Sequence, residues 1–347
     1  MFKIPFSFGR KRSESFGLDV GSSAIKLVQL KETGGVYALG ALAVVPLPAE
    51  AIVDGVIKDP PLVIAAIRDA VAKSGVTTRD AVIGICGRDL IIKKIEIPEV
   101  PAGELAGAIE LEAEHHIPFA ADEVSLDYQV IGRRENVMDL ILVAVKKAKV
   151  AEYVSVVEEA GLTAAVVDVD GFAIENQYEL SASDPNEEAT ALIDIGAAVM
   201  KTNVTRGGAS IFARDIPFGG NRYTEAIASA MSLSFTDAEA TKLRQAGDAG
   251  AIDTVSRELS MEVQRTFDYF ASTAESERIG KIVLSGGCAA LPGLTDFLAS
   301  TWGVPVEIAR PFESIDAAAF ADEVAAAGPS LAVAVGLALR RRGDKTQ

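Results

Sequence analysis

The stretch Phe16-Gly-Leu-Asp-Val-Gly-Ser-Ser-Ala-Ile-Lys26 decides the fold, because its pattern recurs at Ala191-Leu-Ile-Asp-Ile-Gly-Ala-Ala-Val-Met-Lys201. In each copy an apolar run leads into Asp-x-Gly, and a lysine follows seven positions after the aspartate. Asp-x-Gly alone is a common turn. Its recurrence together with the lysine indicates that the chain contains an internal duplication, a pattern that predicts repeated structural units.

The likeness continues downstream of both copies. Gly34-Gly35 and Gly207-Gly208 interrupt the next apolar run, and Pro46 and Pro217 close the run after that. Each copy is therefore predicted to form three strands joined by tight glycine turns.

The rest of the chain is predicted to alternate strands with helices, which in two similar halves is typical of a duplicated α/β protein. A length of 347 residues is enough for about two domains. We expect domain 1 over residues 16–185 and domain 2 over residues 186–347, with a linker in the polar stretch from Ser181 to Glu188.

Composition and charge exclude several classes of protein. Hydrophobic residues make up 49% and charged residues 24%, which excludes a disordered chain. A net charge of −16 repels phosphate backbones and argues against a nucleic-acid partner. The longest apolar run, Leu331–Leu339, is nine residues and ends at three arginines, so no transmembrane helix is expected. Cys86 and Cys288 show no metal spacing and indicate buried free thiols in a reducing compartment, so we expect a cytoplasmic protein.

The first 15 residues mix three phenylalanines with four basic side chains, namely Phe2, Phe6, Phe8, Lys3, Arg10, Lys11 and Arg12. They contain no continuous apolar segment, so they do not form a secretory signal. We expect residues 1–15 to form a flexible basic and aromatic tail. The alternative is a weak contact with an anionic membrane surface.

The turn after Asp19 has the chemistry of a phosphate site. Glycine at position 21 lets backbone amides approach an anion, and the hydroxyls of Ser22 and Ser23 add donors. Lys26 can return along the next strand as a positive charge for a phosphate. Asp19 cannot contact phosphate directly, because like charges repel, and is expected to hold the water molecules of a Mg²⁺ ion.

The second copy repeats this arrangement at Asp194, Gly196 and Ala197. Two such loops facing each other would hold a polyphosphate from both sides, with one cation between them.

Two further glycine turns support a nucleotide site. Gly219 and Gly220 precede a predicted helix, where outward-facing amides favour an anion. Gly286 and Gly287 follow a predicted strand, where backbone without side chains can lie flat against a purine or ribose. The alternative for either turn is an ordinary loop between a strand and a helix.

These segments, in this order, resemble the superfamily of actin, heat-shock ATPases and sugar kinases. Within it the chain is most similar to the PilM family, the cytoplasmic actin-like proteins of type IV pilus assembly, which are relatives of the division protein FtsA. The resemblance covers about residues 16–341. Besides the first copy, its most telling phrases are Glu112-Ala-Glu-His-His-Ile-Pro-Phe119, Val124-Ser-Leu-Asp-Tyr-Gln-Val130 and Val167-Asp-Val-Asp170.

The resemblance implies a duplicated actin-like ATPase fold, in which two similar domains flank a nucleotide cleft that binds ATP and Mg²⁺. It also implies an inserted subdomain of the FtsA and PilM type at about residues 85–160, and a helical subdomain at about residues 221–278. Glu239 and Lys242 would lie beside the adenosine, together with Gly286 and Gly287. The alternative for the first two is an exposed ion pair at i, i+3.

Catalysis is the weakest part of the resemblance. Asp168 and Asp170 are the nearest candidates for a residue that positions the attacking water, and a helix N-cap is the alternative for Asp170. Ala197 and Ala198 stand where relatives with rapid hydrolysis have glycine or acidic residues. We therefore expect ATP binding with slow or negligible turnover.

The resemblance implies a scaffold at the cytoplasmic face of the inner membrane, whose nucleotide state sets the closure of the two domains. Its expected partners are the cytoplasmic N-terminus of the inner-membrane protein PilN and other inner-membrane and motor components of the pilus. Two alternatives stay open. A sugar kinase of the same superfamily would need a sugar-recognition motif, which we do not find. An FtsA-like division protein would be expected to carry an amphipathic membrane helix after Leu339.

Overall fold

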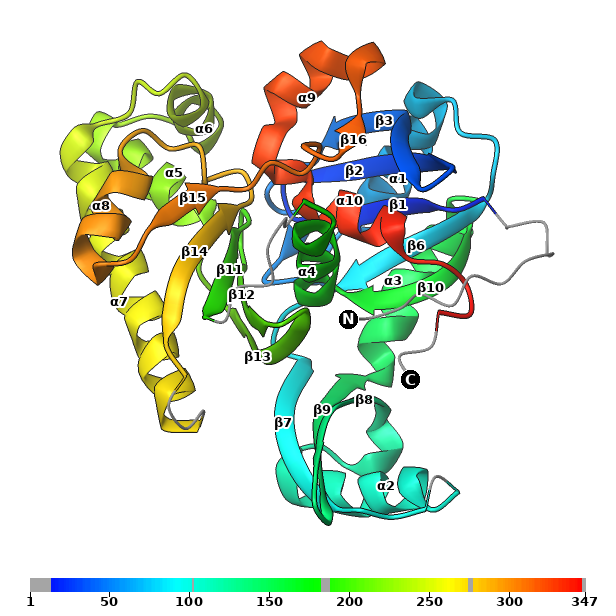
Figure 1. Cartoon of the computed structure of the whole chain (residues 1–347). Helices are drawn as coiled ribbons and strands as arrows, with labels where there is room; N and C mark the ends of the chain where they lie inside the picture. The colour runs from blue at the N-terminus through cyan, green and yellow to red at the C-terminus, as the bar shows by residue number, and fades with distance from the viewer. Residues whose placement is uncertain (1–13, 102, 182–187, 274–276, 345–347) are drawn as a thin grey trace.

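The structure is a computed structural model that describes residues 14–101, 103–181, 188–273 and 277–344. Two domains stand side by side, and a smaller unit extends from the first of them (Figure 1). Most of the predicted tail over residues 1–15, and most of the predicted linker between Ser181 and Glu188, lies outside the described residues.

Domain 1 is built on a six-stranded sheet in the order β10-β6-β1-β2-β3-β16. The first three strands form the predicted antiparallel meander, and β6 and β10 join β1 in parallel. The strands are β1 (Phe16–Val20), β2 (Ala24–Thr33), β3 (Val36–Pro46), β6 (Asp80–Ile85), β10 (Thr163–Val169) and β16 (Ile315–Asp316). A short hairpin of β4 (Ile52–Val53) and β5 (Val56–Ile57) follows the meander.

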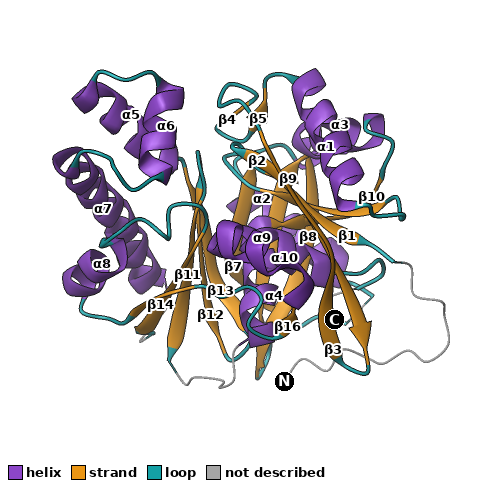
Figure 2. Ribbon diagram, turned by 90° about the horizontal axis from the view of Figure 1, so that it is seen from above, coloured by secondary structure: helices purple, strands orange, loops and turns teal. Residues whose placement is uncertain are grey.

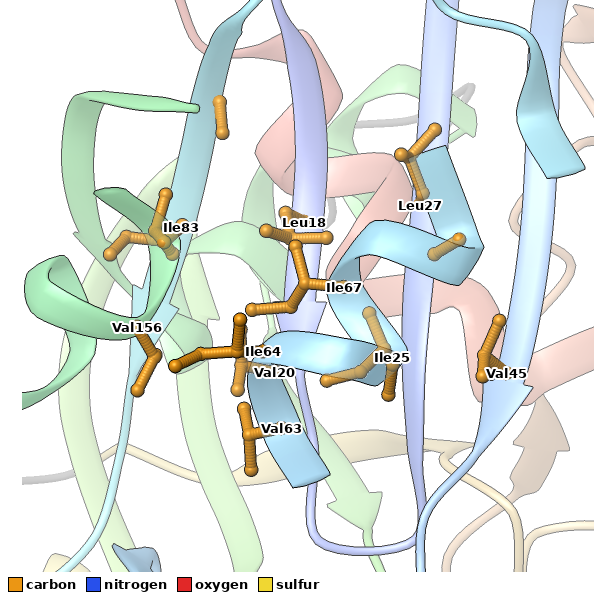
Figure 3. Close-up of a cluster of buried hydrophobic side chains, with 14 of the residues drawn as sticks. Leu18, Val20, Ile25, Leu27, Val45, Val63, Ile64, Ile67, Ile83 and Val156 are labelled. Atoms are coloured by element: carbon orange, nitrogen blue, oxygen red, sulfur yellow. The ribbon is translucent and has the colours of Figure 1, made fainter. Parts of the chain in front are cut away.

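Two helices, α1 (Pro60–Ser74) and α3 (Lys147–Glu159), cover one face of this sheet (Figure 2). The side chain of Asp59 accepts a hydrogen bond from the Leu62 amide and caps the start of α1, and Gly75 ends the helix in the left-handed conformation. Figure 3 shows the core between the sheet and these helices, in which alternate residues of the strands contact the apolar stripe of α1. Burial of this stripe stabilises the packing by about 25 cal/mol per Å² of apolar surface.

Domain 2 repeats the architecture with a five-stranded sheet in the order β13-β12-β11-β14-β15. Its strands are β11 (Ala189–Ile195), β12 (Met200–Arg206), β13 (Ala209–Ile216), β14 (Ile279–Ser285) and β15 (Val306–Ile308), and its helices are α5 (Gly220–Met231), α6 (Phe235–Leu243), α7 (Ala249–Thr273) and α8 (Leu294–Trp302). The pairing of Asp19 with Lys26 across β1 and β2 recurs as Asp194 with Lys201 across β11 and β12. The predicted duplication is therefore confirmed down to strand register.

The smaller unit consists of a three-stranded antiparallel sheet, β7-β9-β8, with one helix on it. Its elements are β7 (Leu90–Pro98), α2 (Leu105–His116), β8 (Val124–Arg134) and β9 (Val137–Lys146). It has a hydrophobic core of its own, centred on Ile109, Met138 and Leu140. Helix α3, which falls within the predicted 85–160 insertion, packs instead into the core of domain 1 through Tyr153 and Val157.

Two helices between the domains each contact the domain that they do not follow in the sequence. Helix α4 (Asp170–Ser181) follows β10 of domain 1, yet the Asn203 amide of β12 in domain 2 donates hydrogen bonds to its Gly171 carbonyl and its Glu175 carboxyl. Helix α10 (Ala332–Leu339) follows domain 2 in sequence, yet it packs against β1 and β2 of domain 1. The two helices cross at Gly336, where a Cβ atom would lie 1.7 Å from the Ala173 carbonyl oxygen.

A helical stretch, Ala318–Leu339, is long and apolar enough to cross a membrane by length and composition, which the nine-residue run did not predict. It comprises a short 3-10 turn, α9 (Ala321–Ala327), the break at Gly328 and α10. Residues Ala332 to Leu337 of α10 are all buried. Helix α10 is therefore a core helix of the domain interface. Its burial explains why its side chains are apolar.

Candidate functional site

The first predicted phosphate loop is the tight turn between β1 and β2. It consists of Gly21, Ser22 and Ser23 and is followed by Lys26 on β2. The Lys26 Nζ atom lies 2.9 Å from Asp19 Oδ2, and both side chains are largely buried. The lysine therefore places a positive charge beside the turn while the aspartate holds it in position.

The second loop repeats this ion pair and adds a hydroxyl. Lys201 Nζ lies 2.9 Å from Asp194 Oδ1, and the Ser285 hydroxyl at the end of β14 donates to Asp194 Oδ2 over 3.0 Å. Burial would raise the pKa of Asp194, but the charges of Lys201 and Lys26 and the hydroxyl of Ser285 outweigh it and hold that pKa below its ordinary value. Because Lys26 follows the first loop, its effect on Asp194 indicates that the two loops lie near each other.

A third contact links the two domains beside the loops. The Gly87 amide, after β6, donates to Asp215 Oδ2 at the end of β13 over 2.6 Å. Burial raises the pKa of the Asp215 carboxyl to about 7, although this hydrogen bond and the charge of Lys201 lower it. Sequence reasoning did not assign Lys201, Asp215 or Ser285 to the candidate site. Two of them had a signal: Lys201 is the counterpart of Lys26 in the repeat, and Ser285 begins the Ser285-Gly286-Gly287 turn.

The predicted turn at Gly219 and Gly220 joins the second loop. The amides of Gly220 and Asn221 donate to the carbonyls of Gly196 and Ala197, each over 2.8 Å. A Cβ atom at Gly219 would lie 2.5 Å from both carbonyl oxygens. These first amides of α5 are thus used in packing the turn against the loop, and close approach accounts for the glycines.

The predicted adenosine residues meet at the start of α5. Lys242 Nζ on α6 lies 2.6 Å from Glu239 Oε2, and donates to the Gly220 carbonyl over 3.1 Å and to the Thr224 hydroxyl over 2.8 Å. Because Lys242 is buried, the alternative of an exposed surface ion pair is wrong for this lysine.

The two glycines after β14 differ in their surroundings. Gly286 has φ of +87°, and a Cβ atom there would lie 2.4 Å from the Ile195 carbonyl oxygen. Gly287 has no atom within 4 Å of the corresponding position. Gly286 is therefore required by the backbone, whereas Gly287 leaves open space that a ligand could approach.

The two catalytic candidates lie in different surroundings. Asp170, the first residue of α4, lies 3.4 Å from Lys201 Nζ through Oδ2 and so belongs to the group around the second loop. Asp168 on β10 pairs instead with Arg340 Nε, just after α10, at 2.8 Å. Burial raises the pKa of Asp168, and the charge of Arg340 partly offsets this. Of the two, Asp170 has the geometry to act beside the loops.

The chemistry of the loops fits a hydrated Mg²⁺ better than a directly ligated metal. In the ranges that the structure describes, no group of three or more acidic, histidine or cysteine side chains could hold a metal ion. Both carboxyl oxygens of Asp194 are engaged within the protein, while the ion pair of Asp19 uses Oδ2. Asp19 would therefore hold cation-bound water with the least rearrangement.

A cavity of about 1030 Å³ lies alongside β14 and β15, next to α4 and the segment that precedes α10. Lys281, Tyr178 and Arg310 are among its lining residues, and none of the predicted nucleotide-binding residues is. The carbonyl of Pro329, which lines the cavity, accepts a hydrogen bond from the Gly286 amide, so the cavity adjoins the candidate site at that turn.

Comparisons with known proteins agree with this architecture. The family model described as Type IV pilus assembly protein PilM matches residues 17–342. A solved structure, the PilM-PilN type IV pilus biogenesis complex, superposes with a TM-score of 0.84 at 30% identity, over 95% of this chain and 98% of that chain. MreB 5 of Spiroplasma citri bound to AMPPNP superposes with a TM-score of 0.54 at 11% identity, over 94% and 95% of the chains, and shares the actin-like fold.

The cell division protein FtsA is a more distant relative. That of Escherichia coli K12 is 34% identical over 110 residues, which are 32% of this chain but only 25% of that protein. That of Pseudomonas aeruginosa is 26% identical over 85% of this chain and 82% of its own length. The expected actin-like fold and the similarity to FtsA are thus confirmed.

Proposed function

The chain belongs to the PilM family of type IV pilus assembly proteins, and we propose from that premise that it is an ATP-binding actin-like scaffold at the cytoplasmic face of the inner membrane. In this proposal it binds the cytoplasmic N-terminus of PilN and, through its nucleotide state, controls assembly of the inner-membrane platform with other pilus components. The observation that carries the proposal is the likeness, over 95% of this chain, to a protein solved in a PilM-PilN complex.

Several features support Mg-ATP as the ligand. The ion pair of Asp19 with Lys26 places a lysine beside the first loop, where polyphosphate would be attracted. Asp194 and Lys201 repeat this ion pair in the second loop. Lys242 and Gly287 lie where adenosine is expected, and MreB 5, with the same fold, was solved with AMPPNP. Because both domains would contact one nucleotide, its binding would favour their closed arrangement.

We expect the nucleotide to act by being bound, without being hydrolysed. A ligand that binds only the folded state stabilises it by about 2.7 kcal/mol at 100 times Kd. We expect Mg-ATP and a non-hydrolysable analogue to raise the melting temperature alike, and a peptide of the PilN N-terminus from the same organism to bind equally with either, measured by fluorescence anisotropy beside a scrambled peptide. Loss of peptide binding with the analogue would contradict a scaffold that needs occupancy alone.

The sugar-kinase alternative makes a different prediction for the same sample. ADP release across a panel of sugars would then exceed about 1 s⁻¹, the low end of typical turnover. The scaffold proposal predicts release well below that rate with every sugar.

Gly287→Val tests where the nucleotide lies. The space beside Gly287 is open, so valine should leave the fold intact and block an approaching base, weakening Mg-ATP binding at least about tenfold, or 1.4 kcal/mol. Isothermal calorimetry with a melting curve would measure both effects. Gly107→Val, which also enters open space but lies on α2, is the control and should leave affinity unchanged. Normal affinity in Gly287→Val would remove this loop from the adenosine site.

A further inference from the structure

Lys201 is the counterpart of Lys26 but has a second partner. Each lysine pairs with the aspartate of its own loop at 2.9 Å. Lys201 Nζ also lies 3.4 Å from Asp170 Oδ2, so one ammonium holds two carboxylates. All three side chains are buried, with exposed side-chain fractions of 10% for Lys201, 7% for Asp170 and 4% for Asp194.

The triad is held from several elements at once. Lys201 is on β12, Asp194 on β11 and Asp170 at the start of α4, the helix that follows domain 1. The other oxygen of Asp170, Oδ1, packs against Gly84 of β6 so closely that a Cβ atom there would lie 1.9 Å from it. Asp170 therefore has little freedom to turn away from Lys201.

The neighbouring carboxylates favour the charged form of Lys201. Burial alone would lower its pKa, but Asp194 and Asp170 outweigh burial and raise that pKa well above the ordinary value. The Lys201 ammonium lies 3.4 Å from Asp170 Oδ2, so this carboxyl oxygen is directed at the cation. A general base must come within about 2.6–3.2 Å of the water that it activates.

We propose that Lys201 is a positioning residue that holds Asp170 away from water and thereby keeps a bound nucleotide from being hydrolysed. This inference rests on the proposed function, because it presumes that ATP binds between the two loops. Released from Lys201, Asp170 could take a proton from a water molecule as its oxygen attacks the γ-phosphorus. The bond from that phosphorus to the β–γ bridging oxygen would break, and ADP would leave with the electron pair.

The test compares Lys201→Met with the unaltered chain and with the matched control Lys149→Met. Lys149 is also a buried lysine, but it donates to the Gly55 carbonyl in domain 1. Both variants should lower the melting temperature, because each removes a buried partner. Only Lys201→Met should raise ADP release at saturating Mg-ATP, by about tenfold or more, which is part of the 10²–10⁴-fold that general bases contribute.

Two further variants separate the proposed role from packing. Adding Asp170→Asn to Lys201→Met should return turnover to the original rate, and Lys201→Arg, which keeps the cation, should never raise it. If Lys201→Met does not fold, Lys201→Gln retains a donor for Asp194 and takes its place.

The outcomes are distinct. Three results would overturn this inference alone: unchanged turnover in a Lys201→Met protein that binds ATP normally by calorimetry, loss of ATP binding by Lys201→Met, or a rise in turnover that survives Asp170→Asn. Failure of the unaltered chain to bind ATP would overturn the proposed function and this inference with it.

Discussion

Replacing Gly336 by alanine should be among the most destabilising single-methyl additions that this chain offers. The new Cβ atom would lie 1.7 Å from the Ala173 carbonyl oxygen and 2.4 Å from its carbon, both backbone atoms of α4. Neither helix can yield easily, because α10 is buried against domain 1 and α4 is hydrogen-bonded to β12. We expect a loss of about 3 kcal/mol or more, the upper range for overpacking a core, measured by urea unfolding.

Replacing Gly107 by alanine should instead raise the free energy of unfolding. Gly107 lies within α2, and a Cβ atom there would meet nothing within 4 Å. Alanine is favoured over glycine inside a helix by about 1 kcal/mol, so Gly107→Ala should stabilise the protein slightly. Equal effects of the two substitutions would show that the close contact of α4 with α10 is not what Gly336 provides.

Replacing Glu175 by glutamine should stabilise the protein in alkaline solution. Glu175 is buried on α4, where its carboxyl accepts hydrogen bonds from Asn203 and Thr205 of β12. Burial, with a smaller contribution from Glu179, raises its pKa from 4.5 to about 8, while these two hydrogen bonds oppose the shift. Glutamine retains the shape and cannot ionise, so Glu175→Gln avoids a buried charge above that pH.

The sign of the pH dependence follows from proton binding. Between pH 4.5 and about 8 the folded state keeps the proton of Glu175, whereas the unfolded chain has released it. The free energy of unfolding therefore falls as pH rises through this window, by about 1.4 kcal/mol per pH unit. Denaturation at pH 5 and pH 8.5 should show a gain for Glu175→Gln on the order of 4 kcal/mol only at the higher pH. Glu110→Gln, at an exposed position on α2, is the control, and parallel curves for Glu175→Gln and the original chain would contradict the assignment.

Local sequence patterns predicted much of this fold, because the turns and strands of each meander are determined by residues close together in the sequence. The Asp-x-Gly turn, the lysine seven residues later and the paired glycines specify each meander, and the first hairpin of both has the same register. The second hairpins differ in length, because Lys26 pairs with Val44 whereas Lys201 pairs with Asp215. By contrast, β16 is two residues long and pairs with β3 only because the chain returns from domain 2, which no local pattern encodes.

The parts of the site that escaped prediction depend on distant segments. Lys201 was visible in the repeat, but its second partner, Asp170, reaches it only after α4 has crossed to the sheet of domain 2. The bonds from Gly220 and Asn221 to the second loop likewise join turns that are separate in sequence. The length of the apolar run Leu331–Leu339 argued against a membrane span, but only the structure shows why α10 is apolar, namely that it is buried between the domains.

The packing of α10 against domain 1 constrains the order in which the chain can fold during synthesis. Domain 1 comes first in synthesis, yet part of its core is supplied by Leu331, Ala334 and Val335, which leave the ribosome only after all of domain 2. Until then the other face of its sheet, including Val28 and Leu42, has no permanent cover. This face of the first half therefore stays open to chaperones and proteases until α10, which follows domain 2 in the sequence, has been synthesised.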